Sequence, residues 1–368
     1  MNRKVKHVLG ISGGKDSAAL AIYMKSKYPS LGIEFYTCDT GKELDETYQL
    51  IRNLEVYLGL KIKILTATQN SSEAPFDHFL KMYGGFLPSS NARWCTKKLK
   101  LEPFERYVGD DPVVSYVGIR GDEDREGYIS TKSNIQSIFP FRRNIWSEDV
   151  IRKLFSNSSI DQVHAIAKEI DFGEKKQKVL SLIAKKIDYF FSQKQKLERF
   201  LDTDVKGFNY LVFTFLKSTN YPLASETNFP LLDNDEMLVQ SDIFKLLEES
   251  GVGVPAYYNK IDFDFEGVLG QYSRSRSGCY FCFYQQKIEW VWLYEQHPEL
   301  FKKAMDYEKD GYTWGQSESL EELIKPERIA QIKDDYLKRQ KRLQNKKSPY
   351  LLDILGEAEG EGCASCFL

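Results

Sequence analysis

The chain has 368 residues, enough for about two domains at roughly 150 residues each. Hydrophobic residues make up 42% and aromatic residues 14%, which excludes a disordered or collagen-like protein. The formal charge is −2, so no global basic field indicates a nucleic-acid-binding protein. The apolar runs are too short to span a membrane, and the first residues lack a secretory apolar core, so we expect a soluble cytoplasmic protein.

The first 120 residues alternate between strand-like and helix-like segments, which is typical of a parallel α/β sheet. The expected strands are residues 7–11, 33–38, 62–66 and 113–119, with expected helices at residues 18–28 and 45–58. Right-handed crossovers and short loops would make this a doubly wound sheet, with its ligand at the carboxyl ends of the strands.

Residues 151–228 differ, because no Gly-rich turns separate strands and apolar residues recur at helical spacing among lysines. We expect a mostly helical insertion there, between a first domain at residues 1–150 and the remainder of the core at residues 229–368. The aromatic stretch at residues 280–294 is expected to pack in the core rather than stack on bases. The basic run at residues 338–347 (KRQKRLQNKK) is either a patch for a nucleic-acid backbone or a solvated helix face.

The strongest motif is SGGKDS at residues 12–17, between the first expected strand and the first expected helix. Gly13 and Gly14 let the backbone approach a phosphate, and the helix start offers unpaired N–H groups and the positive end of its dipole. Lys15 and the hydroxyls of Ser12 and Ser17 add further donors. The motif is shorter than GxxxxGK[ST], with an Asp directly after the Lys, and an ordinary strand-to-helix turn is the alternative interpretation.

SGGKDS resembles the pyrophosphate-binding loop of the N-type ATP pyrophosphatases, in the adenine nucleotide α-hydrolase-like superfamily. Within it, the chain is most similar to the phosphoadenosine phosphosulfate (PAPS) reductase family, including the DNA phosphorothioation sulfurtransferases. Four further segments carry this resemblance: residues 38–41 (CDTG) with Glu43, Glu46 and Thr47; residues 93–100 (RWCTKKLK); residues 118–120 (GIR) with Asp122, Glu123 and Arg125; and Tyr257 and Tyr258 followed by residues 276–282 (RSGCYFC). The insertion is not covered.

The resemblance implies a HUP-like fold whose first domain binds an adenine nucleotide. The expected catalytic residues are Lys15, Asp16, Asp39 and Arg120. Nucleotide contacts are expected from the loop, the end of the second strand and nearby cations, namely Ser12, Gly13, Gly14, Lys15, Asp16, Ser17, Asp39, Thr40, Gly41, Lys97, Arg120 and Arg125. Asp16 or Asp39 is expected to hold Mg²⁺ against the phosphates of ATP, whereas Lys97 could equally lie on a solvated helix face.

Four of the six cysteines form two CxxC pairs, Cys279 with Cys282 and Cys363 with Cys366. Two such pairs can supply a closed four-sulfur shell for Zn²⁺ or a [4Fe–4S] cluster, provided that the C-terminal pair folds back onto the first. In one alternative, Cys95 joins Cys279, Cys282 and one C-terminal cysteine, as in some members of the resembled family. In another, the C-terminal dithiol is mobile and delivers sulfur or electrons.

Together these features predict an ATP pyrophosphatase-type enzyme that adenylates an acceptor, with sulfur then replacing the activated oxygen of a nucleic acid or related substrate. Positioning and electrostatic stabilisation would carry the reaction. One alternative is a reductase of PAPS or adenosine phosphosulfate (APS), although the ECG-type ending of those enzymes is missing. Another is a non-catalytic nucleotide-sensing subunit of a multi-protein system such as phage defence. The expected partners are an adenine nucleotide, a nucleic-acid acceptor, and a sulfur-donor or defence-system protein, with no membrane.

Overall fold

The computed structural model describes residues 4–68, 71–123, 130, 132–309, 311–315 and 318–345. Five parallel strands form its central sheet in the order β3-β2-β1-β4-β5, with β1 (Lys6–Gly10), β2 (Glu34–Cys38), β3 (Lys63–Leu65), β4 (Val113–Tyr116) and β5 (Ile135–Ile138). This confirms the predicted doubly wound α/β fold. The strand order reverses between β1 and β4, so the sheet has its switch point at the carboxyl ends of these two strands.

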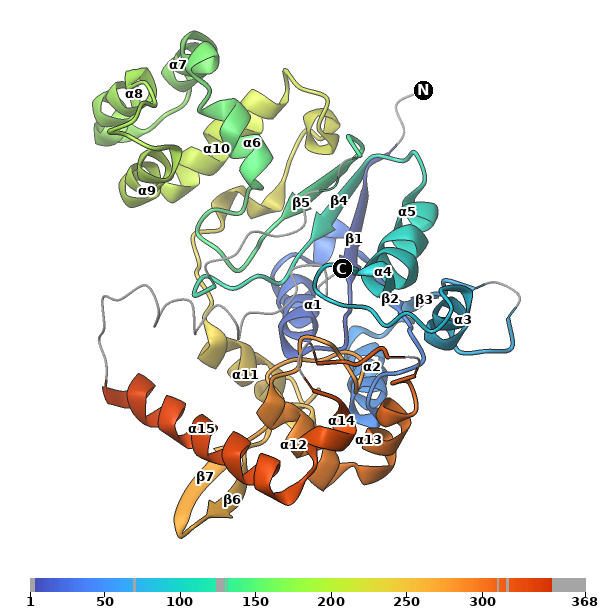
Figure 1. Ribbon diagram of the computed structural model, residues 1–368. Coiled ribbons are helices and arrows are strands. Elements are labelled where there is room, and N and C mark those ends of the chain that lie inside the picture. The colour runs from blue at the N-terminus through green and yellow to red at the C-terminus, as the bar shows by residue number, and fades with distance from the viewer. Residues whose placement is uncertain are drawn as a thin grey trace.

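Helices α1 (Lys15–Lys27) and α2 (Asp45–Leu58) follow β1 and β2 (Figure 1). Helix α1 begins three residues earlier than predicted, so the last half of the SGGKDS motif forms its first turn. After β3 come α3 (Pro75–Met82), α4 (Trp94–Thr96), a π-helical segment (Lys97–Leu101) and α5 (Glu102–Val108). Strand β4 is shorter than predicted, and β5 was not predicted.

Helices α6 (Glu148–Leu154), α7 (Ile160–Glu169), α8 (Lys176–Ala184), α9 (Gln193–Thr203) and α10 (Val205–Leu216) fill the region expected to be a helical insertion. Helix α11 (Gln240–Glu249) follows and packs on α1. Short 3₁₀ turns lie at Pro29–Leu31, Asn157–Ser159, Gly173–Lys175, Pro222–Ser225, Pro230–Asp233 and Ala256–Tyr258. Apolar side chains of α7 to α10 belong to the same buried cluster as those of β1 and α1, so packing links the insertion to the sheet. The domain boundaries at residues 150 and 228 remain predictions.

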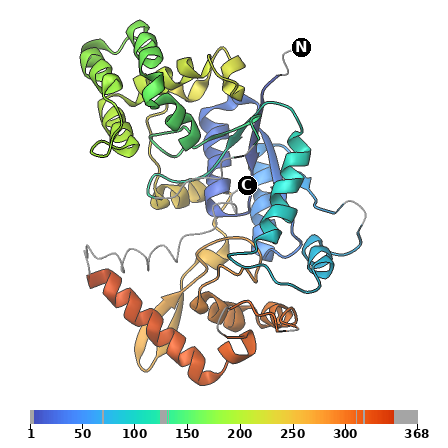
Figure 2. The ribbon, with the colours of Figure 1, turned by 45° about the horizontal axis from the view of Figure 1, so that its top comes forward.

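The remaining elements are a hairpin of β6 (Ile261–Phe265) and β7 (Val268–Tyr272), and helices α12 (Lys287–Gln296), α13 (Pro298–Met305), α14 (Leu320–Leu323) and α15 (Pro326–Asn345). They surround a second buried cluster that contains Phe281, Trp290 and Trp292, so these aromatic side chains pack in the core. Figure 2 shows the sheet between α7–α9 at one end of the molecule and this C-terminal part at the other. Within the described residues, no helix combines the length and apolarity that crossing a membrane requires.

Candidate functional site

The loop at residues 12–17 is closed by its own hydroxyl groups. The Ser12 backbone N–H donates to Ser17 Oγ at 3.1 Å, and the Ser17 hydroxyl donates to the Gly14 carbonyl at 3.1 Å. Ser12 Oγ lies 3.1 Å from Ser17 Oγ. The Ser17 hydroxyl is therefore used to shape the loop, and Ser17 itself is buried.

Two glycines are required by close approaches at this loop. Gly13 has a φ of +74°, and a Cβ there would lie 2.2 Å from Thr47 Cγ2 on α2. A Cβ at Gly118, just after β4, would lie 2.9 Å from the Asp16 carbonyl oxygen. Because both positions exclude a side chain, the loop packs directly against α2 on one side and the end of β4 on the other.

The first turn of α1 carries a buried group of charges. The Asp16 carboxylate lies 2.8 Å from Arg120 Nη1 and 3.4 Å from Lys15 Nζ, and only 3% of Asp16 is exposed. Arg120 also pairs with Asp122 and Glu123. Burial alone would lower the pKa of Arg120, but the adjacent Asp16 carboxylate raises it above its ordinary value. Predicted residues Lys15, Asp16 and Arg120 thus lie in one ion-paired group at the sheet switch point.

Residues from the C-terminal part of the chain contact the same loop. The Tyr257 hydroxyl donates to the Gly13 carbonyl at 3.1 Å, and Lys15 Nζ lies 4.8 Å from the centroid of the Tyr258 ring. Ser277 is close as well, because a Cβ at Gly14 would lie 2.5 Å from Ser277 Oγ. The two segments that carried the sequence resemblance, 240 or more positions apart, therefore form one site.

At the end of β2, Asp39 and Glu43 share a hydrogen-bond network. Asp39 Oδ1 accepts from the Gly41 backbone N–H at 2.8 Å and from the Tyr48 hydroxyl at 2.9 Å. Glu43 accepts from the Thr40 hydroxyl at 2.6 Å and from Tyr48 at 3.1 Å, and burial raises the pKa of Glu43 above its usual range. Thr40 is buried and Gly41 has a φ of +73°, so both shape the turn that aims Asp39.

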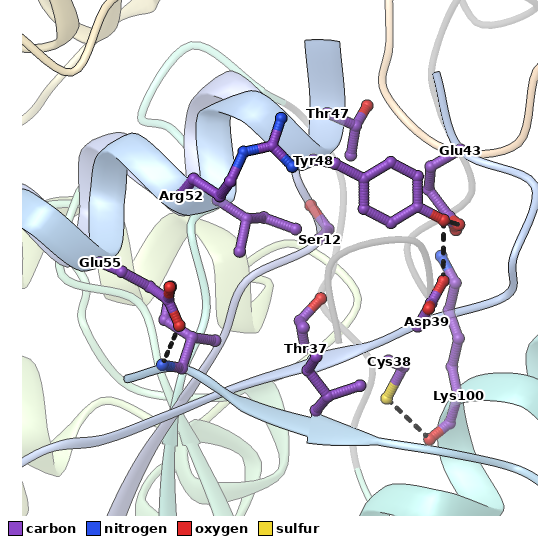
Figure 3. Close-up of a pocket in the computed structure, with 13 residues that line it drawn as sticks. Ser12, Thr37, Cys38, Asp39, Glu43, Thr47, Tyr48, Arg52, Glu55 and Lys100 are labelled. Atoms are coloured by element: carbon purple, nitrogen blue, oxygen red, sulfur yellow. Dashed lines mark hydrogen bonds between the residues drawn. The ribbon is translucent and has the colours of Figure 1, made fainter. Parts of the chain in front are cut away.

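A cavity of about 190 Å³ lies beside this network, between β2, β3 and α2 (Figure 3). Figure 3 shows the Lys100 side chain beside Asp39, Tyr48 and Glu43, with Ser12 of the loop at the same cavity. The lining residues are Ser12, Thr37, Cys38, Asp39, Glu43, Thr47, Tyr48, Ile51, Arg52, Glu55, Ile62, Ile64 and Lys100. The cavity is smaller than the 300–1,000 Å³ or so of typical ligand pockets, so a nucleotide would have to extend beyond it.

A second, smaller cavity of about 40 Å³ brings three cysteines together. Cys95, Cys279 and Cys282 all line it, and Lys100 lines it too. Cys279 Sγ lies 3.2 Å from Thr40 Oγ1. Burial raises the pKa of all three thiols, that of Cys95 to about 12. The thiols are not arranged as a formed metal site, since the described residues contain no group of three or more potential ligands at binding positions.

The chemistry of the surrounding donors fits a group that accepts hydrogen bonds next to these sulfurs. Arg274 is 1% exposed, and only its Nη2 has a partner, the Cys279 carbonyl at 3.0 Å. Its Nε and Nη1, and both amide atoms of Gln285, have no hydrogen-bond partner among the described residues. A buried guanidinium stays charged, so it favours negative charge on the neighbouring sulfurs.

Asp39 and Asp16 differ as possible ligands of Mg²⁺. Both described hydrogen bonds of the Asp39 carboxylate go to Oδ1, which leaves Oδ2 as the oxygen that suits a cation. Asp16 is already neutralised by Lys15 and Arg120, which makes it a poor ligand in this arrangement. The geometry therefore favours Asp39 of the two predicted carboxylates.

Some predicted residues do not join the site. Lys97 is exposed, whereas Lys100, three positions later, lines both cavities. Arg125 and the C-terminal pair Cys363 and Cys366 lie outside the described residues. Lys338, in the basic run, pairs with Asp334 on α15, and residues 346 and 347 of that run also lie outside the described residues.

The sequence predicted no role for Tyr48, Glu43 or Tyr257. Tyr48 and Glu43 form the hydrogen-bond network beside Asp39, and Tyr257 hydrogen-bonds to the loop at residues 12–17. The spacing of Glu43 and Thr47 after residues 38–41 was part of the resemblance, so Glu43 had a signal that was not used. Tyr48 had none, because its role depends on the turn that brings α2 back over Asp39.

Comparison with known proteins shows that the first part of the chain has relatives. Residues 6–150 match the phosphoadenosine phosphosulfate reductase domain. An uncharacterised protein of Methanocaldococcus jannaschii is 32% identical over 36% of this chain and 28% of its own length. An uncharacterised nin region protein of Escherichia phage lambda is 26% identical over 32% of this chain and 49% of its own. The tRNA-specific 2-thiouridylase MnmA of Pasteurella multocida is 25% identical over 48% of this chain and 50% of its own.

The chain thus spans half or less of the length of these curated relatives, and no solved structure matches it. The matched region contains β1 to β5, the loop at residues 12–17, Asp39 and Arg120. Residues 6–150 therefore form a PAPS reductase domain, a domain type of the adenine nucleotide α-hydrolase-like superfamily.

Proposed function

We propose that this protein is an ATP pyrophosphatase-type sulfurtransferase that activates an oxygen of a nucleic acid and lets sulfur replace it. The observation that carries the proposal is the buried group of Lys15, Asp16 and Arg120 at the start of α1, where helix N–H groups and cations favour a polyphosphate. The tRNA-specific 2-thiouridylases among the relatives support the choice of acceptor class.

In the proposed reaction, the acceptor oxygen attacks the α-phosphorus of ATP. The bond between that phosphorus and the bridging oxygen of the β-phosphate breaks, and pyrophosphate leaves with the electron pair. A sulfur nucleophile then displaces AMP from the adenylated acceptor. Arg120 and Lys15 would stabilise the charge on pyrophosphate, and Lys100 would reach the phosphates from the cavity beside Asp39. Mg²⁺ bound at Asp39 would neutralise phosphate charge.

The cysteines are proposed to serve the sulfur side of this reaction. Cys279 and Cys282, with Cys363 and Cys366, would hold Zn²⁺ or a [4Fe–4S] cluster, and Cys95 is the alternative ligand because it lines the same cavity. Anaerobic purification with metal analysis and a visible spectrum tests this. Iron with labile sulfide supports a role in sulfur chemistry, zinc supports a structural site, and a metal-free protein contradicts both.

The function is tested with ATP labelled at the α-phosphate, Mg²⁺, a sulfide donor, and either bulk tRNA or duplex DNA as acceptor. The expected result is acceptor-dependent release of AMP and pyrophosphate. Lys100→Ala should lower this rate about tenfold or more, because Lys100 lies at the cavity beside Asp39. The matched control, Lys98→Ala, removes a lysine that pairs with Glu102 in the same segment, and should retain the rate.

A PAPS reductase is the second candidate, because the matched domain bears that name and three thiols line one cavity beside Thr40. Release of sulfite from PAPS with a reduced dithiol protein, without cleavage of ATP, would favour it over the sulfurtransferase. A protein that binds ATP but releases no pyrophosphate with any acceptor would instead indicate a nucleotide-sensing subunit.

A further inference from the structure

The turn between α8 and α9 exposes two adjacent aromatic side chains. Tyr189 is 95% and Phe190 87% exposed, the highest values for large hydrophobic residues in the described part of the chain. Their rings contact each other edge to face, with centroids 5.3 Å apart. Leaving each ring in water forgoes about 1.5–3 kcal/mol of burial free energy, so an exposed pair indicates a surface that another molecule covers.

The turn holds these two side chains outward in a fixed way. Asp188 Oδ1 accepts from the backbone N–H groups of Phe190 and Phe191 at 2.8 and 2.9 Å, and Asp188 and Phe191 exchange two backbone hydrogen bonds. Phe191 is 3% exposed and anchors the turn to the helices. Because both ends of the turn are fixed, the aromatic pair is preorganised, and binding through it costs less conformational entropy.

The surroundings of the turn are basic, in contrast to the chain as a whole. Residues 173–199 contain eight Lys and Arg against three Asp and Glu, a net charge of +5, while the whole chain carries −2. Lys185 Nζ lies 3.9 Å and the Arg199 guanidinium carbon 5.1 Å from the centroid of the Phe191 ring. Lys185, Lys186 and Arg199 are exposed and form no ion pair with the described acidic residues. Their charge is therefore available to an anionic partner.

We propose that this turn binds unpaired nucleotides of a nucleic acid. Tyr189 and Phe190 stack on bases, and Lys185, Lys186 and Arg199 contact the phosphate backbone. The pairing of exposed rings with uncompensated cations matches a partner that has both aromatic faces and regular negative charge. The inference rests on the proposed function for its choice of partner, since that function requires a nucleic-acid acceptor.

The position of the turn determines what it can do for the reaction. Figures 1 and 2 show α8 and α9 at the end of the molecule opposite the C-terminal part that contacts the loop at residues 12–17. The turn therefore contacts a region of the nucleic acid distant from the reacting atom. It contributes to affinity and to the choice of substrate rather than to the chemical step.

The test measures fluorescence anisotropy of labelled RNA and DNA oligonucleotides of about 20 nucleotides, single-stranded and duplex, without ATP. Tyr189→Ser with Phe190→Ser should weaken binding of single strands at least about tenfold, because stacking contributes about 1–3 kcal/mol per base. Binding of duplexes should change little. Lys185→Ser with Lys186→Ser should lower the slope of log affinity against log salt by about 1.4, or about 0.7 per phosphate contact.

Controls on other surfaces separate this site from general effects. Leu269→Ser removes another exposed apolar side chain, on β7, and Lys302→Ser with Lys303→Ser removes two exposed charges on α13. Both controls should bind as the unaltered protein does. The RNA and DNA arms show which nucleic acid is preferred, and binding of either supports the proposal.

Wild-type affinity of the aromatic double variant for single strands would overturn the proposal. A change in the oligomeric state of this variant, measured by light scattering, would also overturn it, because the turn would then be an interface between copies. The proposal would equally fail if the variant lost binding to anionic vesicles but kept its binding to oligonucleotides. The binding assay contains no ATP, so its result does not depend on the proposed reaction. If no pyrophosphate is released in the activity assay, the proposed reaction is refuted, but the proposed binding surface is not. If oligonucleotide binding does not depend on the turn while ATP is still cleaved, the binding surface is refuted and the proposed reaction is not.

Discussion

Two neighbouring segments of the site differ in whether their buried polar groups have hydrogen-bond or ion-pair partners. In the loop at residues 12–17, every hydroxyl and charge has a partner: Ser12 and Ser17 bond within the loop, and Asp16 pairs with Lys15 and Arg120. In residues 274–285, two nitrogens of Arg274 and both amide atoms of Gln285 have no partner among the described residues. The segments nevertheless touch, through Ser277 and Gly14.

The difference indicates how each segment reaches its working form. A buried polar group without a hydrogen-bond partner costs about 1–3 kcal/mol. The polar groups of the loop all have partners and avoid this cost, whereas residues 274–285 contain several buried atoms that are unpaired within the described part of the chain. The loop is thus preorganised for a ligand. The unpaired N–H groups of Arg274 would be stabilised by a hydrogen-bond acceptor placed beside them.

Removing the carboxylate of the loop's ion group should have the largest effect. Asp16→Asn removes the buried counter-charge of Lys15 and leaves Arg120 only its pairs with Asp122 and Glu123, so unfolding free energy should fall by up to about 3–5 kcal/mol. Denaturant unfolding measures this. The control is Asp202→Asn, which breaks an exposed pair with Arg143 and should cost about 1 kcal/mol or less. Equal losses for the two variants would show that the loop is not stabilised in this way.

Filling the close approach at Gly13 should have the next largest effect. Gly13→Ala places a Cβ 2.2 Å from Thr47 Cγ2 at a φ of +74°, so we expect a loss of about 2–4 kcal/mol from overpacking and backbone strain together. Adding Thr47→Ala should recover the stability lost through overpacking and leave a loss of about 1 kcal/mol from backbone strain. Thermal unfolding of the three variants checks this, and a double variant no more stable than Gly13→Ala would contradict the assigned contact.

The sequence predicted the loop side of the site better than the cysteine side, and the reasons are physical. Strands β1 to β3 and helix α2 were predicted because glycine turns and apolar periodicity mark them locally. Strand β5 was missed because two of its four buried residues, Gln136 and Ser137, are polar. Lys97 was a predicted nucleotide contact, but the π-helical segment, which no local pattern in the sequence marks, turns Lys100 toward the cavities instead.

Long-range contacts had no local signal at all. Tyr257 meets the Gly13 carbonyl across 244 positions of sequence, and the Lys15 backbone N–H donates to the Tyr258 hydroxyl across 243. Their motif resemblance placed them near the site, but only the folded arrangement gives them partners.

The pH dependence of stability tests β1, the strand that leads into the loop at residues 12–17. Burial lowers the pKa of His7 to about 4, and neutral His7 lies 2.8 Å from the Tyr116 hydroxyl on β4. Its contribution to stability is fully present above the unfolded pKa of about 6.5 and is lost as pH falls through 4, up to about 3 kcal/mol. His7→Gln keeps a polar partner for Tyr116 without titrating. Stability measured from pH 7 to pH 4 should fall less steeply in this variant; identical slopes would show that His7 is charged in the folded protein.

The smallest expected effect gives the sharpest test of the cysteine side. Arg274→Leu removes a buried guanidinium that has a single partner, so the metal-free protein should gain about 1–2 kcal/mol in unfolding free energy. If sulfur ligated to a metal accepts the two remaining N–H groups, the same variant should retain less metal after dialysis against a chelator. Lys287→Leu is the control, because its ammonium pairs with Glu318 at the half-exposed start of α12 and has no contact with the cysteines. A variant that is destabilised without metal would mean that Arg274 already has an acceptor in the folded chain, and the contrast between the two segments would disappear.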